Sequence, residues 1–261
     1  MTAEENVLGS LVKKQGTTST ALVTRSNVPE GLSYTKYRPH LRYDFFCSCA
    51  YCNMTESEAQ AIRFTIDHYH PQTARPDLVD VYSNLMYACD ECNTRKGDRY
   101  PPPEAQSDGN RFFRPDLDSF DDHFEAVGIR LEPKSKVGRY TILTVDLTRQ
   151  TLRRLREIRS RLTKCDSYVA EGIAGLRNFH IDRLPTHIKA QAANAIENAA
   201  RMAESMAKGI DSVLRDYAKS SLLELEQDAE LEARTKERME SLKQLEGLYP
   251  GAWRAPRKKK R

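Results

Sequence analysis

In the middle of the chain, the pattern of apolar residues predicts two strands followed by a helix. The segment from 129 to 147 is predicted as two strands around a turn. Thr148 then has the character of a helix N-cap. The apolar residues that follow it recur at helical spacing, at Leu152, Leu155, Ile158 and Leu162. A helix with one apolar stripe is therefore predicted directly after the two strands.

A second apolar pattern runs through a long helical region that begins after Pro185 and reaches about Glu246. Its members follow alternating steps of four and three, which is typical of a narrow seam between helices: Ala192, Ile196, Ala199, Ala203, Met206, Ile210, Val213 and Tyr217. A more loosely spaced set follows: Leu222, Leu225, Leu231, Met239, Leu242 and Leu245. Isolated helices are marginal in water, so the seam must be covered. The cover is either a hairpin packed on itself or on the rest of the chain, or a partner such as a second copy.

These patterns divide the 261 residues into four parts. An N-terminal arm (1–33) precedes a lobe (34–127) that holds five of the cysteines and four of the six histidines. A basic strand-helix extension (128–184) and a helical C-terminal region with a basic tail (185–261) follow. The predicted fold class is α+β.

Charge limits where nucleic acid can bind. The net charge is +4, but the last eight residues carry six Lys or Arg, so the rest sums to 4 − 6 = −2. Between Arg130 and Lys164 there are eleven Lys or Arg against three Asp or Glu. This local excess predicts phosphate contacts, for which Arg149, Arg153 and Arg156 are the candidates.

The chain has no apolar stretch of about 18 residues and no start typical of a secretory signal. We therefore expect a cytoplasmic protein, in whose reducing compartment clustered cysteines are more often metal ligands than disulfides. Two CxxC pairs stand 36 residues apart and predict a closed, structural four-cysteine zinc site: Cys49, Cys52, Cys89 and Cys92. Cys47 is a competing ligand.

Oxygen-donating residues that a thiolate zinc site does not need lie between and beside the two pairs. Asp67 and His68 are adjacent, so on a strand their side chains point in opposite directions. A carboxylate together with an amide oxygen, for which Asn84 and Asn93 are both at hand, suits a hexacoordinate Mg²⁺ ion. A neutral histidine beside it can take a proton from water.

Four stretches, "CAYC", "IDHYHP", "NLMYACDECNTRKGD" and "RFFRPDLDSFDDHF", resemble the HNH endonuclease family, over residues 34–127. The resemblance implies a ββα-metal lobe that cleaves phosphodiester bonds, usually in DNA. It implies that His68 is the general base and that Asp67 and Asn93 hold Mg²⁺ or Mn²⁺. It also implies that Asn84 braces a loop and orients the histidine.

Several other residues, and the function itself, have alternative roles. His70 has either a structural role or a phosphate contact, and Arg95 and Lys96 are further candidate phosphate contacts. A non-catalytic zinc-ribbon module that binds nucleic acid or protein, and an RNA-directed nuclease, are the alternative functions. Members of the family that resemble this chain often act in bacterial or phage defence, sometimes beside an ATPase. DNA, a second copy or such a partner protein are therefore the expected partners.

Overall fold

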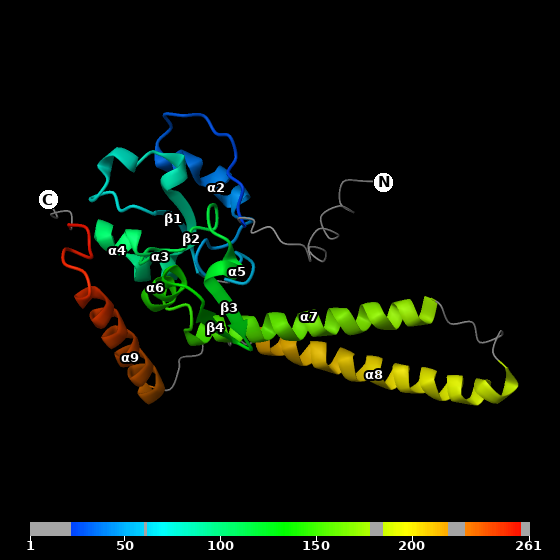
Figure 1. Ribbon diagram of the computed structural model, residues 1–261. Coiled ribbons are helices and arrows are strands. Elements are labelled where there is room, and N and C mark those ends of the chain that lie inside the picture. Colours follow the sequence, from blue (N-terminus) through cyan, green and yellow to red (C-terminus); the bar gives the residue numbers. More distant parts are fainter. Residues whose placement is uncertain (1–21, 60–61, 178–184, 219–227, 257–261) are drawn as a thin grey trace.

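The computed structural model describes residues 22–59, 62–177, 185–218 and 228–256. Within these residues the structure combines many helices with two small sheets, as expected for an α+β protein (Figure 1). None of the described helices is long and apolar enough to cross a membrane.

An antiparallel hairpin forms the centre of the lobe. Strand β1 (Phe64–His68) pairs with β2 (Leu85–Cys89), and the register places Asp67 opposite Met86 and His68 opposite Leu85. All five residues of β2 are buried, so this strand is the apolar interior of the lobe.

Helices cover both faces of this hairpin. The short helix η1 (Tyr34–Tyr37) and helix α2 (Arg38–Asp44) lie on one face, where Tyr34 contacts the His68 ring. Helix α3 (Asp90–Lys96) lies on the other face, where Lys96 contacts Asp67. Because side chains alternate along a strand, the two neighbours Asp67 and His68 face different helices.

Residues 69–84 connect the two strands through two single-turn helices, η2 (Pro76–Leu78) and η3 (Tyr82–Asn84). Downstream of α3 lie α4 (Pro103–Ser107), α5 (Phe120–His123) and a second hairpin, β3 (Phe124–Val127) with β4 (Arg130–Pro133).

The prediction of two strands across 129–147 is half wrong. The first is β4, but the second is helix α6 (Lys136–Val145). Ser135 caps this helix by accepting a hydrogen bond from the Gly138 amide. A Cβ atom on Gly138 would lie 2.0 Å from the His123 carbonyl oxygen, so glycine allows α6 to pack directly against α5. Tertiary packing here overrides the strand preference of the β-branched residues in α6.

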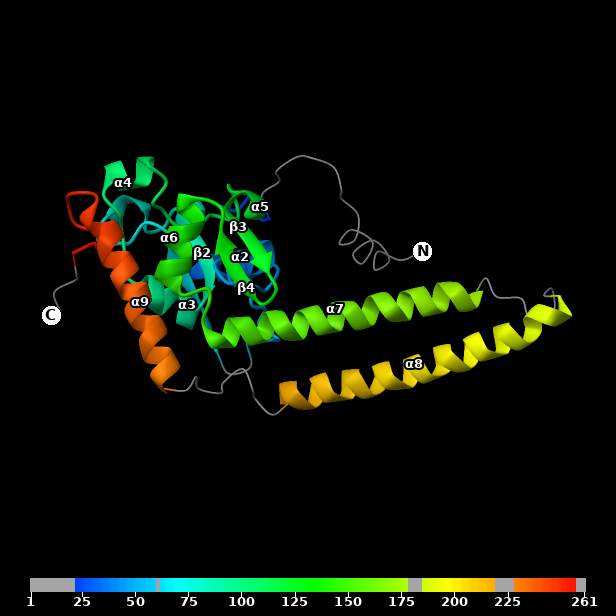
Figure 2. The same cartoon turned by 60° about the horizontal axis from the view of Figure 1, so that its bottom comes forward.

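A long pair of helices extends away from the lobe. Helix α7 (Gln150–Arg177) runs outward and α8 (Thr186–Ala218) returns beside it (Figures 1 and 2). The predicted stripe on α7 is confirmed near the lobe, where Leu152, Leu155 and Ile158 are buried, whereas Leu162 is 41 % exposed. On the α8 seam, Ala192 is buried and Ile196 is 36 % exposed. The side chains of Ala203, Met206, Ile210, Val213 and Tyr217, and residues Leu222 and Leu225, lie outside the described parts.

The end of the chain returns to the lobe. Helix α9 (Asp228–Gly247) packs against α6 and buries Leu242 and Leu245. The Tyr100 amide then donates to the Trp253 carbonyl (2.9 Å), and the Ala255 amide donates to the Asp98 carbonyl (2.7 Å). Part of the predicted C-terminal region is thus bonded to the lobe.

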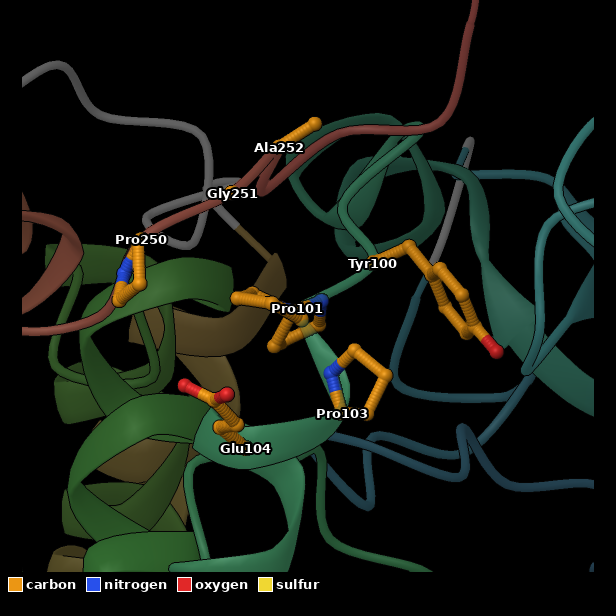
Figure 3. A pocket seen from close by; sticks show the side chains of 8 residues that line it. Tyr100, Pro101, Pro103, Glu104, Pro250, Gly251 and Ala252 are labelled. Carbon is orange, nitrogen blue, oxygen red and sulfur yellow. The ribbon is translucent and has the colours of Figure 1, made fainter.

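Figure 3 shows where this C-terminal segment crosses the proline-rich loop that follows α3. Pro250, Gly251 and Ala252 line one side of an open pocket of about 370 Å³, and Tyr100 to Glu104 line the other. A Cβ atom on Gly251, which has φ of +116°, would lie 3.3 Å from Pro102 Cβ, so the two segments are in close contact here.

Candidate active site and metal centre

The four paired cysteines form one cluster. Their sulfur atoms all lie within 4.8 Å of one another, and Cys52 Sγ is 3.9 Å from Cys89 Sγ. A zinc ion with four Zn–S bonds of ~2.3 Å separates its sulfurs by about 3.8 Å, so the cluster fits tetrahedral zinc. The backbone explains the geometry, because one pair lies in the turns after α2 and the other spans the end of β2 and the first turn of α3. Cys47 is not a member of this cluster.

Arg149 was a predicted phosphate contact, and its position corrects that prediction. The residue is 3 % exposed, its Nη2 donates to Cys92 Sγ over 3.4 Å, and its Nε lies 3.0 Å from Glu91 Oε2. Its charge is therefore beside the cysteine cluster, where a positive charge favours thiolates. The arginine run alone could not reveal this position, which depends on the packing of the start of α7 onto α3.

His68 is held at the end of β1 by contacts to its imidazole. Nε2 is 2.9 Å from the Val79 carbonyl oxygen, which requires that Nε2 carry the proton. Nδ1 then holds the lone pair, and the Gln72 side-chain amide lies 3.2 Å from it. Burial lowers the pKa of His68 below its ordinary value. The imidazole is therefore neutral at pH 7, with Nδ1 as its basic atom.

Asn84 fixes the loop that supplies the Val79 carbonyl. The side chain is buried; its Oδ1 accepts from the His70 amide (2.9 Å) and its Nδ2 donates to the carbonyls of His70 (3.2 Å) and Leu78 (3.1 Å). One residue thus clamps both arms of the connection between the strands.

Asp67 lies on the opposite side of the strand and is almost fully buried. Its Oδ1 accepts from Lys96 Nζ (2.9 Å), and its Oδ2 accepts from the Tyr51 hydroxyl (2.5 Å). Burial, and then the negative charge of Asp67, raise the pKa of Tyr51, so this hydroxyl stays protonated. Tyr51 belongs to the first CxxC pair, which ties the carboxylate to the cysteine cluster.

Asn93 lies on α3 one turn before Lys96. Its Nδ2 donates to Thr65 Oγ1 (2.9 Å), two residues before Asp67 on the same face of β1. Its Oδ1 accepts none of the hydrogen bonds made within the described ranges. The amide oxygen is thus a suitable metal ligand, but it is bonded to the strand at Thr65 and not at Asp67.

This arrangement does not fit an open Mg²⁺ or Mn²⁺ site. Octahedral Mg²⁺ needs a reachable carboxylate oxygen with room for several waters. The Asp67 side chain is only 5 % exposed, both of its oxygens are hydrogen-bonded, and an ammonium group already balances its charge. A divalent ion at Asp67 requires a rearrangement.

Lys96 was a predicted phosphate contact, and this prediction is also corrected, because the side chain is fully buried against Asp67. The other candidates are partly exposed but engaged. Arg95 pairs with Glu91 (3.0 Å) and with Asp146, and Arg153 lies 3.8 Å from Glu230.

Arg156 donates to the Leu147 carbonyl (2.7 Å), and burial lowers its pKa to about 10. His70 is half-buried, and burial together with Arg114 lowers its pKa to about 4.

Comparison with known proteins bears directly on this site. The family model described as "HNH endonuclease" matches residues 49–99. Residues 49–99 are therefore an HNH domain. No curated protein and no solved structure matches the chain.

The HNH match runs from the first cysteine of the cluster to just beyond α3 and includes Asp67, His68, Asn84 and Asn93. It indicates a nuclease or nucleic-acid-binding role with a four-cysteine metal site. Tyr34 and Arg149 contact this domain from outside the match. Tyr34 packs its ring edge-on against His68, with ring centroids 4.9 Å apart, and Arg149 reaches the cysteine cluster. Sequence spacing gave no signal for either.

Proposed function

We propose that this chain is an endonuclease that hydrolyses phosphodiester bonds in DNA, with His68 as general base. The observation that carries the proposal is the state of the His68 ring. Its Nε2 proton is committed to the Val79 carbonyl, and its lowered pKa leaves Nδ1 unprotonated at neutral pH.

The chemistry assigned to His68 is a single proton transfer. A water oxygen attacks phosphorus and gives its proton to Nδ1, while the bond from phosphorus to the leaving oxygen breaks and that oxygen takes a proton from solvent. Asn84 is a positioning residue in this scheme, because its bonds to His70 and Leu78 set the loop that presents Val79. Gln72, which lies 3.2 Å from Nδ1, must yield this position to the attacking water.

The proposal treats the structural metal ion and the catalytic metal ion differently. Zinc in the four-cysteine cluster would stabilise the lobe and take no part in the reaction. Family members use divalent ions for cleavage, where such an ion stabilises developing negative charge. The contacts around Asp67 do not fit such an ion. Mg²⁺ or Mn²⁺ at Asp67 and Asn93 therefore stays a prediction from the family resemblance, and no step is assigned to it.

The decisive experiment uses supercoiled plasmid and zinc-loaded protein, with Mg²⁺, Mn²⁺ or a chelator. We expect nicked or linear plasmid from the wild type, and a loss of ~10²–10⁴ in rate for His68→Ala with unchanged zinc content. His187→Ala, which changes an exposed histidine on α8, is the matched control and should cleave normally. His70→Ala should lose less activity than His68→Ala. If His70→Ala is inactive while His68→Ala still cleaves, the general base is not His68.

A specific observation favours a second function, a non-catalytic zinc module that binds nucleic acid. The buried ion pair of Asp67 with Lys96 is what a purely structural site would retain. Binding of DNA without cleavage by the wild type under every metal condition would support this alternative. Single-stranded RNA in the same assay tests the RNA-directed alternative. A role in bacterial or phage defence, with an ATPase as partner, is proposed from the family resemblance alone.

A further inference from the structure

Lys96 is an unusual residue in the HNH domain because its charged side chain has no exposure to solvent. Lysine is almost never fully buried unless it is paired. Its ammonium lies 2.9 Å from Asp67 Oδ1 and 2.8 Å from the His68 carbonyl oxygen, and 5.5 Å from the centre of the Phe112 ring. These contacts match the three N–H donors of an ammonium group with two oxygens and one aromatic face.

The same ammonium contacts both residues of the Asp67–His68 pair. It holds the side chain of one and the main chain of the other, from the last turn of the helix that also carries Asn93. It therefore lies where a divalent ion at the predicted ligands would have to act. A second cation cannot share this buried carboxylate with the ammonium at low cost, because the two positive charges repel one another.

We infer that Lys96 is the resident cation of this site, and that a divalent metal ion binds Asp67 only when the Lys96 ammonium leaves it. The inference rests on the proposed function, since it concerns the metal ligand of that reaction. It explains how the lobe keeps a buried carboxylate stable without a catalytic metal. It also makes Lys96 a competitor of the metal, in place of the phosphate contact predicted from sequence.

Removal of the lysine charge distinguishes the role of the Lys96 ammonium from that of a metal ion. In Lys96→Met the Asp67 carboxylate is buried with only the Tyr51 hydroxyl as partner, so the protein is less stable and the carboxylate is free to bind a metal ion. In Tyr51→Phe the lysine stays in place, so metal affinity should remain that of the wild type.

The test measures Mn²⁺ binding to zinc-loaded, full-length protein without nucleic acid. Free Mn²⁺ is quantified by electron paramagnetic resonance, and stability is measured by thermal unfolding. We expect Lys96→Met to bind one Mn²⁺ at least tenfold more tightly than the wild type. Its melting temperature should rise with Mn²⁺, and the gain should vanish in the double variant Lys96→Met/Asp67→Asn. Equal affinity in the wild type and Lys96→Met, a gain that persists without Asp67, or an equal gain in Tyr51→Phe would overturn the inference.

A wild-type measurement keeps the inference testable if Lys96→Met does not fold. Acetylation of Lys96 is measured by mass spectrometry while Mn²⁺ is added. The inference is supported if acetylation of Lys96 rises as Mn²⁺ binds, or if Lys96 stays protected from acetylation while no Mn²⁺ is bound at Asp67. Bound Mn²⁺ that requires Asp67 and leaves Lys96 protected overturns it. Because no DNA is present, an inactive protein that still shows this competition would refute the proposed nuclease function alone.

Discussion

Replacement of Asn84 by alanine tests the link between loop and base most directly. The side chain is 3 % exposed and makes three hydrogen bonds, to the His70 amide, the His70 carbonyl and the Leu78 carbonyl. Each buried hydrogen bond contributes a net ~1 kcal/mol, so Asn84→Ala should lower the free energy of unfolding by about 3 kcal/mol. For a chain of this size that loss lowers the melting temperature by roughly 6–12 °C.

The assay is urea unfolding of zinc-loaded protein, with plasmid cleavage measured on the same samples at a temperature where both variants are folded. Ser83→Ala is the matched control, because it changes an exposed neighbour and should stay within about 0.5 kcal/mol of the wild type. Cleavage by Asn84→Ala should fall by ~10², since misplacement of a catalytic group by about 1 Å has this effect. A loss of less than about 0.5 kcal/mol, or full activity at normal stability, would refute the clamp.

Four further predictions concern zinc, pH and packing. Cys89→Ser should lose the single tightly bound zinc and unfold the lobe, whereas Cys47→Ser should keep zinc, as metal analysis of both would show. The pKa of His70 is lowered to about 4, so its neutral form contributes stability above pH ~6.5 that is lost as the pH falls towards 4; unfolding of His70→Gln should depend less on pH in this window. Trp253→Ala, at a buried contact between the C-terminal segment and the lobe, should cost ~3–5 kcal/mol in urea unfolding. Gly138→Ala should destabilise by at least ~1–3 kcal/mol in the same assay, because the added methyl group meets the His123 carbonyl; unchanged stability would show that α6 can shift.

Truncation of the chain near Lys164 tests whether the C-terminal helices belong to the lobe. Such a chain lacks helices α8 and α9 and the segment that follows α9. Leu242, Leu245 and Trp253 are buried against the lobe, so this truncation should expose their contact surface and reduce stability. Deletion of residues 165–227 alone is the sharper test of an assembly role for the α7–α8 hairpin.

The sequence by itself determined the local chemistry of this protein. Two CxxC pairs were sufficient to predict the four-cysteine cluster, because each pair can present two thiolates to one tetrahedral ion. The HNH motif likewise located the His68 ring and Asn84, and the apolar stripe located the start of α7. Each of these signals lies within a short stretch of sequence, so it can be recognised without knowledge of the fold.

Only the tertiary structure decided which charges are available. A run of arginines gives no means of telling Arg149, which lies against Cys92, from an exposed neighbour, because burial depends on how α7 meets α3. In the same way Lys96 has the sequence character of a surface cation, yet the packing of α3 on β1 places it against Asp67. The strand predicted across α6 failed for the same reason, since long-range packing around Gly138 outweighs local propensity. Residue types and spacing therefore set the candidate ligands and base, while long-range contacts set the charge balance that governs whether a metal ion can reach them.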